Sequence, residues 1–244
     1  MKSVPCSHFN LQHTIESGQL FRFEKKDGGY FINAADRFFF AKQENNKLFF
    51  DGNVDERLIA HFFRLDEDHC ETIGKICHDK HVANAVESYR GIRLLRQDPF
   101  ECIISFICSS ASNIPRIHRN VNDIARLFGE KKTAIIQGQK YGYFAFPKSG
   151  MIDDERRLAK VRLGYRAKFL LQSNSTVTQK FLKELNTKRY CDAKTQLMTL
   201  PGVGEKVADC ILLFSCGHLN AFPVDTWISK VMSELYFSKE CKKN

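Results

Sequence analysis

Short aromatic runs alternate with turn-forming residues over the first fifty or so positions of the chain. The runs are QLFRF, GYFINA, RFFFAKQ and KLFF, and KKDGG, NAAD, ENN and DGN lie between or after them. Turn signals at nearly even spacing between aromatic runs are typical of antiparallel strands joined by short connections. The pattern predicts a small antiparallel sheet that ends near residue 53.

The hydrophobic period changes to a helical one from DERLIAHFF onward. Leu58, His61, Phe62 and Leu65 repeat at a spacing of three to four residues, which predicts a helix. Asp98 is a good N-cap for the next predicted helix, because Pro99 follows it directly. Further helices are predicted in IPRIHRNVNDIARLF, in DDERRLAKVRLGYRAKFLLQSNSTVTQKFLKEL, in TKRYCDAKTQLMTL, in EKVADCILLFSC and in TWISKVMSELY.

These patterns predict an α+β fold with two parts. Residues 1–95 are expected to form the antiparallel sheet domain with a helical extension, and residues 96–244 a mostly helical domain. Hydrophobic residues make up 43% of the 244 positions, as in a globular protein. The net charge of +9 favours a polyanionic partner such as nucleic acid, although a merely basic protein would show the same excess.

The cysteine content indicates a reducing compartment. None of the nine cysteines forms a CxxC pair, so the sequence gives no support for a zinc ribbon or a thioredoxin site. Most lie in apolar runs, as buried free thiols do. The N-terminal MKSVPCSHFN lacks the apolar segment of a signal peptide, and no run has the length needed to span a bilayer. We expect a soluble intracellular protein without a membrane partner.

The stretch LPGVGEKVADC predicts a helical hairpin. Pro201 ends the first helix, and Gly202 and Gly204 allow another backbone to approach closely. The second helix then presents unpaired amides and the positive end of its dipole, which together bind phosphate without reading base sequence. An ordinary glycine turn between two helices would have the same letters.

Two charged residues near this hairpin suggest chemistry. Lys206 lies in the first turn of the second helix, where a cation opposes the dipole, and it shares a face with Cys210. Asp225 precedes TWISKVM at a position suited to an N-cap. A lysine nucleophile and a charge-stabilising carboxylate could use these places. A solvated lysine and a purely structural cap would also fit.

Taken together, the motifs resemble the helix–hairpin–helix DNA glycosylases, and more closely the eukaryotic-type 8-oxoguanine DNA glycosylase/AP lyase family. The resemblance is carried by ESGQLFRF, YRGIRLLRQDPFECIISFICSS, NIPRI, RLGYRAKF, LPGVGEKVADC and PVDTW, which extend over nearly the whole chain. It implies a small antiparallel sheet domain packed on a helical bundle. It also implies excision of 8-oxoguanine flipped out of duplex DNA, with Schiff-base β-elimination and no cofactor or metal.

The resemblance assigns roles to the residues of the base pocket. Lys206 matches the nucleophile that attacks C1′, and Asp225 matches the carboxylate that supports base loss. Gly18 matches the glycine whose carbonyl accepts a hydrogen bond from N7–H, which ordinary guanine lacks. Cys210 matches the residue that lies against one face of the flipped base.

Further matches concern the opposite strand and the backbone. Arg116 matches the arginine that reads the cytosine left behind, and Tyr143 is matched to a tyrosine wedged beside it. Gly202, Gly204 and Val207 match backbone contacts to phosphate. A double-stranded DNA containing 8-oxoguanine is therefore the expected partner.

The chain departs from the family at three places. Ala111 stands where the family usually has asparagine, and Trp227 where some members have a phosphate-binding histidine. The family continues into further C-terminal helices that supply an aromatic residue and a glutamine to the base pocket. This chain ends at Asn244, so we expect those helices to be absent, either naturally or by truncation.

Two functions from different classes remain open on the sequence. The first is the glycosylase/lyase, and the second is a non-catalytic binder of damaged DNA that kept the hairpin but lacks a complete pocket. An iron–sulphur glycosylase would need four clustered C-terminal cysteines, and only Cys241 lies beyond Cys216. We expect a monomer in the nucleus, with a bacterial cytoplasm as the alternative.

Overall fold

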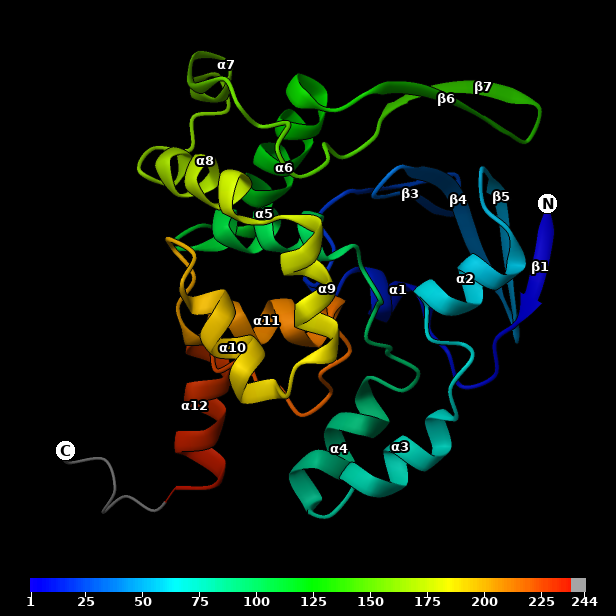
Figure 1. The fold of residues 1–244 in the computed structure, drawn as a ribbon. Coiled ribbons are helices and arrows are strands. Elements are labelled where there is room, and N and C mark those ends of the chain that lie inside the picture. The colour runs from blue at the N-terminus through cyan, green and yellow to red at the C-terminus, as the bar shows by residue number, and fades with distance from the viewer. Residues whose placement is uncertain (238–244) are drawn as a thin grey trace.

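The computed structural model describes residues 1–237 and shows an α+β protein (Figure 1). Within these residues, the strands are β1 (Lys2–Pro5), β2 (Phe23–Lys26), β3 (Gly29–Ala34), β4 (Arg37–Glu44), β5 (Lys47–Gly52), β6 (Lys131–Ile136) and β7 (Gln139–Phe144). The helices are α1 (Leu11–Ile15), α2 (Glu56–Phe62), α3 (His69–Ile76), α4 (Lys80–Ser88), α5 (Pro99–Ser109), α6 (Ile114–Phe128), α7 (Glu155–Ala159), α8 (Arg166–Thr176), α9 (Gln179–Thr187), α10 (Tyr190–Met198), α11 (Glu205–Ser215) and α12 (Thr226–Leu235). The chain after residue 237 lies outside the described residues, so the expectation that further C-terminal helices are absent stays a prediction.

The N-terminal sheet has five antiparallel strands in the order β1-β5-β4-β3-β2. Both of its faces are covered, which explains why its strands are aromatic runs rather than clean alternations of apolar and polar residues. On one face Tyr30, Phe39 and Phe50 pack with side chains of α1 and α2. On the other face Phe31 and Phe40 pack against the β6–β7 hairpin.

The predicted sheet is confirmed in its main part and wrong in its details. GYFINA, RFFFAKQ and KLFF are strands, but QLFRF is not, because β2 begins only at Phe23. Phe21 instead joins the helical core, where its ring lies 5.6 Å from that of Phe106. The sequence reading also missed β1 and the β6–β7 hairpin, although KKTAIIQGQKYGYF does carry a turn at Gln137 and Gly138.

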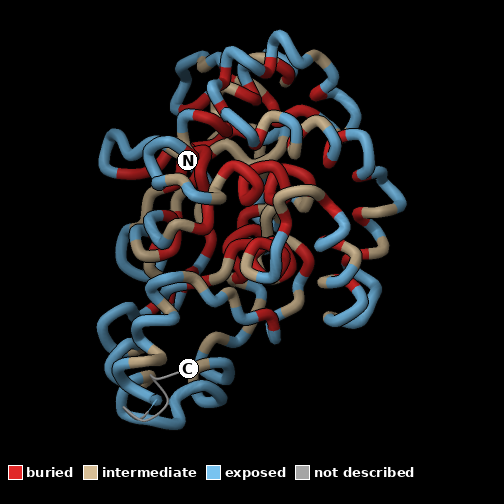
Figure 2. The backbone as a smooth tube through the Cα atoms, turned by 90° about the vertical axis from the view of Figure 1, so that its left-hand side faces the viewer, coloured by how far each residue is buried: buried red, intermediate tan, exposed pale blue. Residues whose placement is uncertain are grey.

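Helix α5 is the centre of the helical part. Every residue from Phe100 to Cys108 is buried, and α6, α8 and α11 all pack against the helix. A helix that is apolar all round must be enclosed in this way. Figure 2 shows the resulting core of buried backbone in the middle of the molecule.

A buried ion pair joins the sheet to this core. Arg22 Nη1 lies 3.3 Å from Glu101 Oε1, and the exposed side-chain fractions are 2% and 8%. The other oxygen of Glu101 accepts a hydrogen bond from the Ala35 amide at 2.7 Å, while Arg22 also donates to the carbonyl of Phe144. Burial raises the pKa of Glu101, and the charge of Arg22 opposes that rise. The pair thus fixes β3, α5 and the end of β7 together.

Candidate active site

The helix–hairpin–helix is formed by α10 and α11, as predicted. Gly202 has a φ of +80°, and a Cβ there would lie 2.5 Å from Phe169 Cδ2, so both the backbone and the space require glycine. Gly204 is exposed and is the N-cap of α11, and no side chain in the described residues bonds to the first amides of that helix. These amides are available to a phosphate oxygen.

A buried carboxylate links the two helices. Asp209, on α11, is 5% exposed. Its carboxylate accepts hydrogen bonds from the Tyr190 hydroxyl at 2.7 Å and from Lys194 Nζ at 3.0 Å, both on α10. The Val207 side chain is buried in the same core, so only its backbone can contact DNA. The roles of Gly202, Gly204 and Val207 at phosphate remain predictions that this geometry fits.

Lys206 is half-buried rather than fully solvated. Its Nζ lies 5.6 Å from the centre of the Phe106 ring, at the end of α5, and that ring stacks on Phe214. The ammonium group of the lysine therefore lies over an aromatic floor formed by Phe106, whose face attracts a cation. Phe106 was not recognised from the sequence, where its apolar spacing indicates only a core residue.

Cys210 and Asp225 lie close to this lysine. Burial raises the pKa of the Cys210 thiol to about 11, the nearby Lys206 ammonium acts in the opposite direction, and the carboxylates of Asp209 and Asp225 add to the rise. Lys206 and Cys210 are one turn apart on α11, and Asp225 at the start of α12 acts on the same thiol, so the three groups share one electrostatic neighbourhood. No ion pair within 4.0 Å joins Lys206 to Asp225 in residues 1–237.

The predicted capping role of Asp225 is confirmed. Its Oδ1 accepts hydrogen bonds from the amides of Trp227 at 3.0 Å and Ile228 at 2.8 Å. The two bonds hold one carboxylate oxygen at the helix terminus and leave the other oxygen free of bonds from within residues 1–237. The capping bonds therefore hold the carboxylate in position, and because the donors are neutral amides, no cation neutralises its charge.

Asp225→Asn should separate capping from chemistry. Asparagine caps about as well as aspartate, so we expect the free energy of unfolding to change by less than about 0.5 kcal/mol. The lost charge should slow any reaction that develops positive charge at the site by about a hundredfold. Chemical denaturation and single-turnover excision measure the two effects. Asp225→Ala is the contrasting variant, and it should lose about 1 kcal/mol of stability as well.

Gly18 lies in a loop that is anchored to the same region. It follows α1 with a φ of +84°, and a Cβ there would lie 3.9 Å from Ile114, at the start of α6. Gln97 links this loop to α11. Its side-chain amide donates to the Gln19 carbonyl at 2.7 Å, and its backbone N–H donates to the Phe214 carbonyl at 2.9 Å. The loop is therefore held beside the helix that carries Lys206.

Arg116 and the unpredicted Tyr165 are both exposed, and a bond to Arg162 links the segments that carry them. Arg116 is in the first turn of α6, and its Nη2 donates to the Arg162 carbonyl at 3.2 Å. Tyr165 lies three positions after Arg162 in the chain and is 55% exposed. The buried Arg166 lies 4.6 Å from the Tyr165 ring centre and donates to the Ala111 carbonyl at 2.8 Å. This contact ties α8 to the loop in which Ala111 has a φ of +45°.

Tyr143 does not fit the wedge role. It is 5% exposed, its ring stacks on Phe38 at 5.2 Å, and its hydroxyl donates to the Asp36 carbonyl and accepts from Asn53, both at 2.9 Å. A side chain held in this way anchors the β6–β7 hairpin to the sheet and cannot enter a base stack. The exposed Tyr165 is the better candidate for the wedge. In the sequence, only its place in RLGYRAKF points to it.

Residues 1–237 contain no group of three or more histidine, cysteine, aspartate or glutamate side chains arranged to hold a metal ion. No helix in the same residues is long and apolar enough to cross a membrane.

A small sheet domain packed on a helical core, with a glycine hairpin, a lysine in the next helix and a capping aspartate, defines a helix–hairpin–helix glycosylase fold. Residues 3–103 match the family model for the N-terminal domain of 8-oxoguanine DNA glycosylase. The chain is 33% identical to the probable N-glycosylase/DNA lyase of Methanothermobacter thermautotrophicus and 34% identical to the N-glycosylase/DNA lyase of Saccharomyces cerevisiae, over 73% and 72% of its length. These matches span 63% and 50% of the two relatives, so the chain covers less than two thirds of either.

Solved structures extend the similarity to almost the whole chain. The apo form of the Clostridium acetobutylicum 8-oxoguanine glycosylase/lyase has a TM-score of 0.86 at 31% identity, covering 94% of this chain and 82% of that one. Its complex with double-stranded DNA containing cytosine opposite 8-oxoguanine gives 0.86 at 28%, with coverages of 98% and 87%. The chain belongs to the 8-oxoguanine DNA glycosylase/lyase family.

Proposed function

We propose that the protein is a base-excision-repair DNA glycosylase that removes 8-oxoguanine from duplex DNA, with a preference for cytosine opposite, and then cleaves the strand as an AP lyase. The observation that carries the proposal is the convergence of Lys206, Cys210 and Asp225 beside the free amides of the hairpin. The names of the relatives support the same activity, and the DNA-bound structure of the Clostridium acetobutylicum protein supports a DNA partner.

The geometry accounts for the steps of this reaction. The hairpin amides bind a phosphate and place the flipped nucleotide over the start of α11. The neutral amine of Lys206 forms a bond to C1′ while the glycosidic bond breaks and the base leaves with its electron pair. Asp225 stabilises the positive charge that develops on the sugar. Ring opening gives an imine at C1′, and loss of the C2′ proton then expels the 3′-phosphate.

Borohydride trapping tests the proposal on a duplex with 8-oxoguanine opposite cytosine. Reduction of the imine should give a stable covalent adduct between the protein and DNA. If no adduct forms while the lesion duplex is still bound in preference to undamaged DNA, the non-catalytic damaged-DNA binder becomes the better description. We further propose that the protein acts as a monomer and, because the resemblance is to eukaryotic-type enzymes, in the nucleus.

Tyr165→Ala should weaken excision, whereas Tyr143→Phe should not. An exposed aromatic ring that fills the gap left by a flipped base contributes about 1–3 kcal/mol of stacking, or roughly ten- to a hundredfold in single-turnover kcat/KM. Tyr143→Phe removes only the hydroxyl contacts with the sheet domain. A loss of excision in the second variant and not in the first would show that the Tyr143 hydroxyl contacts, and not the Tyr165 ring, support excision.

Arg116→Met should relax the preference for the opposite base. A guanidinium that reads cytosine contributes about 1–3 kcal/mol of discrimination, so the ratio of excision rates opposite cytosine and adenine should fall by roughly ten- to a hundredfold. Arg119→Met, in the next turn of the same helix, is the matched control for charge. An unchanged ratio in Arg116→Met would show that another group reads the opposite base.

A further inference from the structure

The segment of residues 93–97 connects the loop that carries Gly18 to the helical core. The Gln19 side chain, which is 3% exposed, bonds this segment at two points. Its Nε2 donates to the Arg93 carbonyl at 2.8 Å, and its Oε1 accepts from the Leu95 amide at 2.8 Å. A buried side-chain amide that is bonded at both ends holds two stretches of backbone together. The position of the Gly18 loop therefore depends on that of the segment.

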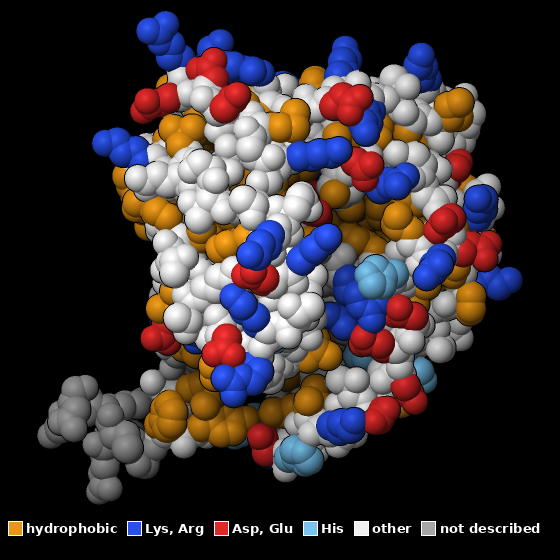
Figure 3. Space-filling view, viewed as in Figure 1, with side chains coloured by type: hydrophobic (Ala, Val, Ile, Leu, Met, Phe, Trp, Pro, Cys, Tyr) orange, Lys and Arg blue, Asp and Glu red, His pale blue; other side chains and the backbone are white. Residues whose placement is uncertain are grey.

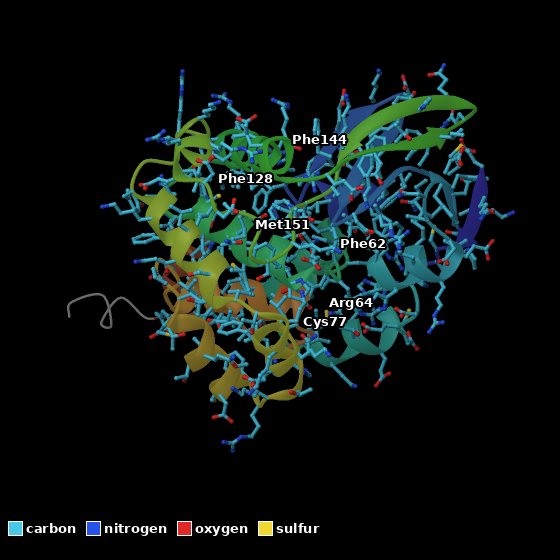
Figure 4. All side chains as sticks on the ribbon, turned by 45° about the horizontal axis from the view of Figure 1, so that its top comes forward. Phe62, Arg64, Cys77, Phe128, Phe144 and Met151 are labelled. Carbon is cyan, nitrogen blue, oxygen red and sulfur yellow. The ribbon has the colours of Figure 1, made fainter. Side chains whose placement is uncertain are left out.

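The same segment is held at its own two ends. The Arg96 amide donates to the Phe62 carbonyl at 3.0 Å, and the Arg96 guanidinium pairs with Asp66 at 2.7 Å. Figure 4 labels Phe62, the last residue of α2. Basic, acidic and histidine side chains gather on the right of the face shown in Figure 3. Asp98, directly after the segment, caps α5. The segment thus joins α2 and α5 to the Gly18 loop.

Gln97 contacts both the Gly18 loop and α11. Its side-chain Nε2 donates to the Gln19 carbonyl at 2.7 Å, and its backbone N–H donates to the Phe214 carbonyl at 2.9 Å. The Gly18 carbonyl, by contrast, accepts no hydrogen bond from any group in residues 1–237. The loop therefore presents a carbonyl that is free for a ligand, directly next to one that Gln97 occupies.

The bond from Gln97 restricts the direction of the free carbonyl. Gly18 has a φ of +84°, and a glycine has a wide choice of backbone angles, so sterics alone do not hold its peptide. Because peptide units are planar, fixing the Gln19 carbonyl narrows the rotation of the preceding Gly18–Gln19 peptide. A hydrogen bond weakens steeply when its angle is poor. Loss of the Gln97 side-chain bond should therefore weaken any hydrogen bond that the Gly18 carbonyl accepts.

We propose that Gln97 is a positioning residue that directs the Gly18 carbonyl at N7–H of the flipped base, and so sets the discrimination between 8-oxoguanine and guanine. Guanine lacks that hydrogen, so its N7 lone pair would face the carbonyl oxygen without a bond. The inference rests on the proposed glycosylase function and on the role that the family resemblance implies for Gly18.

Gln97→Met tests the inference on two substrates. Methionine has a similar length and cannot donate, and the backbone bond to α11 stays in place. Single-turnover excision of 8-oxoguanine opposite cytosine should fall by about tenfold, the effect of one well-placed hydrogen bond. Cleavage of a duplex that already contains an abasic site should change by less than about twofold, because no base is left to recognise. A purely structural role would lower both activities.

Gln12→Met is the matched control. Gln12 lies on α1, shortly before the same loop, and its Nε2 donates to the exposed Glu16 side chain at 3.0 Å. Both activities should be unchanged in this variant. Equal losses of excision and of abasic-site cleavage in Gln97→Met, or no loss of either, would overturn the inference.

Binding measurements separate a failure of this inference from a failure of the proposed function. In a Lys206→Gln background, the protein should bind the 8-oxoguanine duplex more tightly than the guanine duplex. Adding Gln97→Met should reduce the ratio of the two Kd values by about three- to tenfold. The ratio needs no chemistry, so it tests Gln97 even if the wild type neither excises the lesion nor cleaves the abasic site, which would refute the glycosylase function. An unchanged ratio would overturn the role of Gln97.

Discussion

Lys206→Gln is expected to form no borohydride-trapped adduct and to excise 8-oxoguanine on the order of a thousandfold or more slowly than the wild type. The substitution removes the amine that acts on the Cys210 thiol, on which the capped Asp225 also acts. Lys206 is only half-buried and glutamine is a good helix former, so folding should be little affected. Gel-resolved trapping and single-turnover kinetics measure the loss.

DNA binding distinguishes a lost nucleophile from a lost interface. The variant should still bind the lesion duplex, because it keeps the hairpin amides and Arg116, for which we propose the DNA contacts. Lys180→Gln removes the same charge from a side chain on α9 that is 87% exposed, and it should leave trapping intact. A normal adduct with Lys206→Gln would show that another amine is the nucleophile. Loss of binding together with trapping would show that Lys206 chiefly holds phosphate.

The parts of the site that the sequence predicted are those that depend on local rules. Pro201 and the two glycines determine a hairpin within five residues, and the cap at Asp225 follows from the residues directly after it. Lys206 and Cys210 share a face because they are four residues apart in one helix. Each of these inferences needs only the helical period and the backbone preferences of single residues.

The parts that failed depend on packing between distant segments. Tyr143 and Tyr165 both follow a glycine in an aromatic or basic stretch, and only the tertiary structure shows that the first is 5% and the second 55% exposed. Phe106 looked like a core residue and is one, but it is also the floor under Lys206. The β6–β7 hairpin was overlooked because its partner is a sheet face formed a hundred residues earlier.

Arg22 is a further case, because a charged residue inside an aromatic run gives no sign of being buried. Arg22→Met should lower the free energy of unfolding by about 3–5 kcal/mol, since it leaves the Glu101 carboxylate buried without its cation. Urea denaturation measures the loss. Arg22→Met combined with Glu101→Leu should recover most of it, because the whole pair is then replaced by apolar groups. Arg37→Met, which breaks the exposed pair with Asp36, should cost less than about 1 kcal/mol.

The pH dependence of the stability loss in Arg22→Met tests whether the unpaired Glu101 carboxylate causes that loss. Burial already raises the pKa of Glu101 in the wild type, and loss of Arg22 removes the main influence that opposes the rise. The folded state of Arg22→Met then keeps its proton at pH values where the unfolded chain has lost it, so stability falls as the pH rises above the ordinary pKa of glutamate. The variant should therefore be less destabilised at pH 5 than at pH 8. A loss that does not change with pH would mean that the Phe144 carbonyl, and not Glu101, is the partner that needs Arg22, because a carbonyl does not titrate.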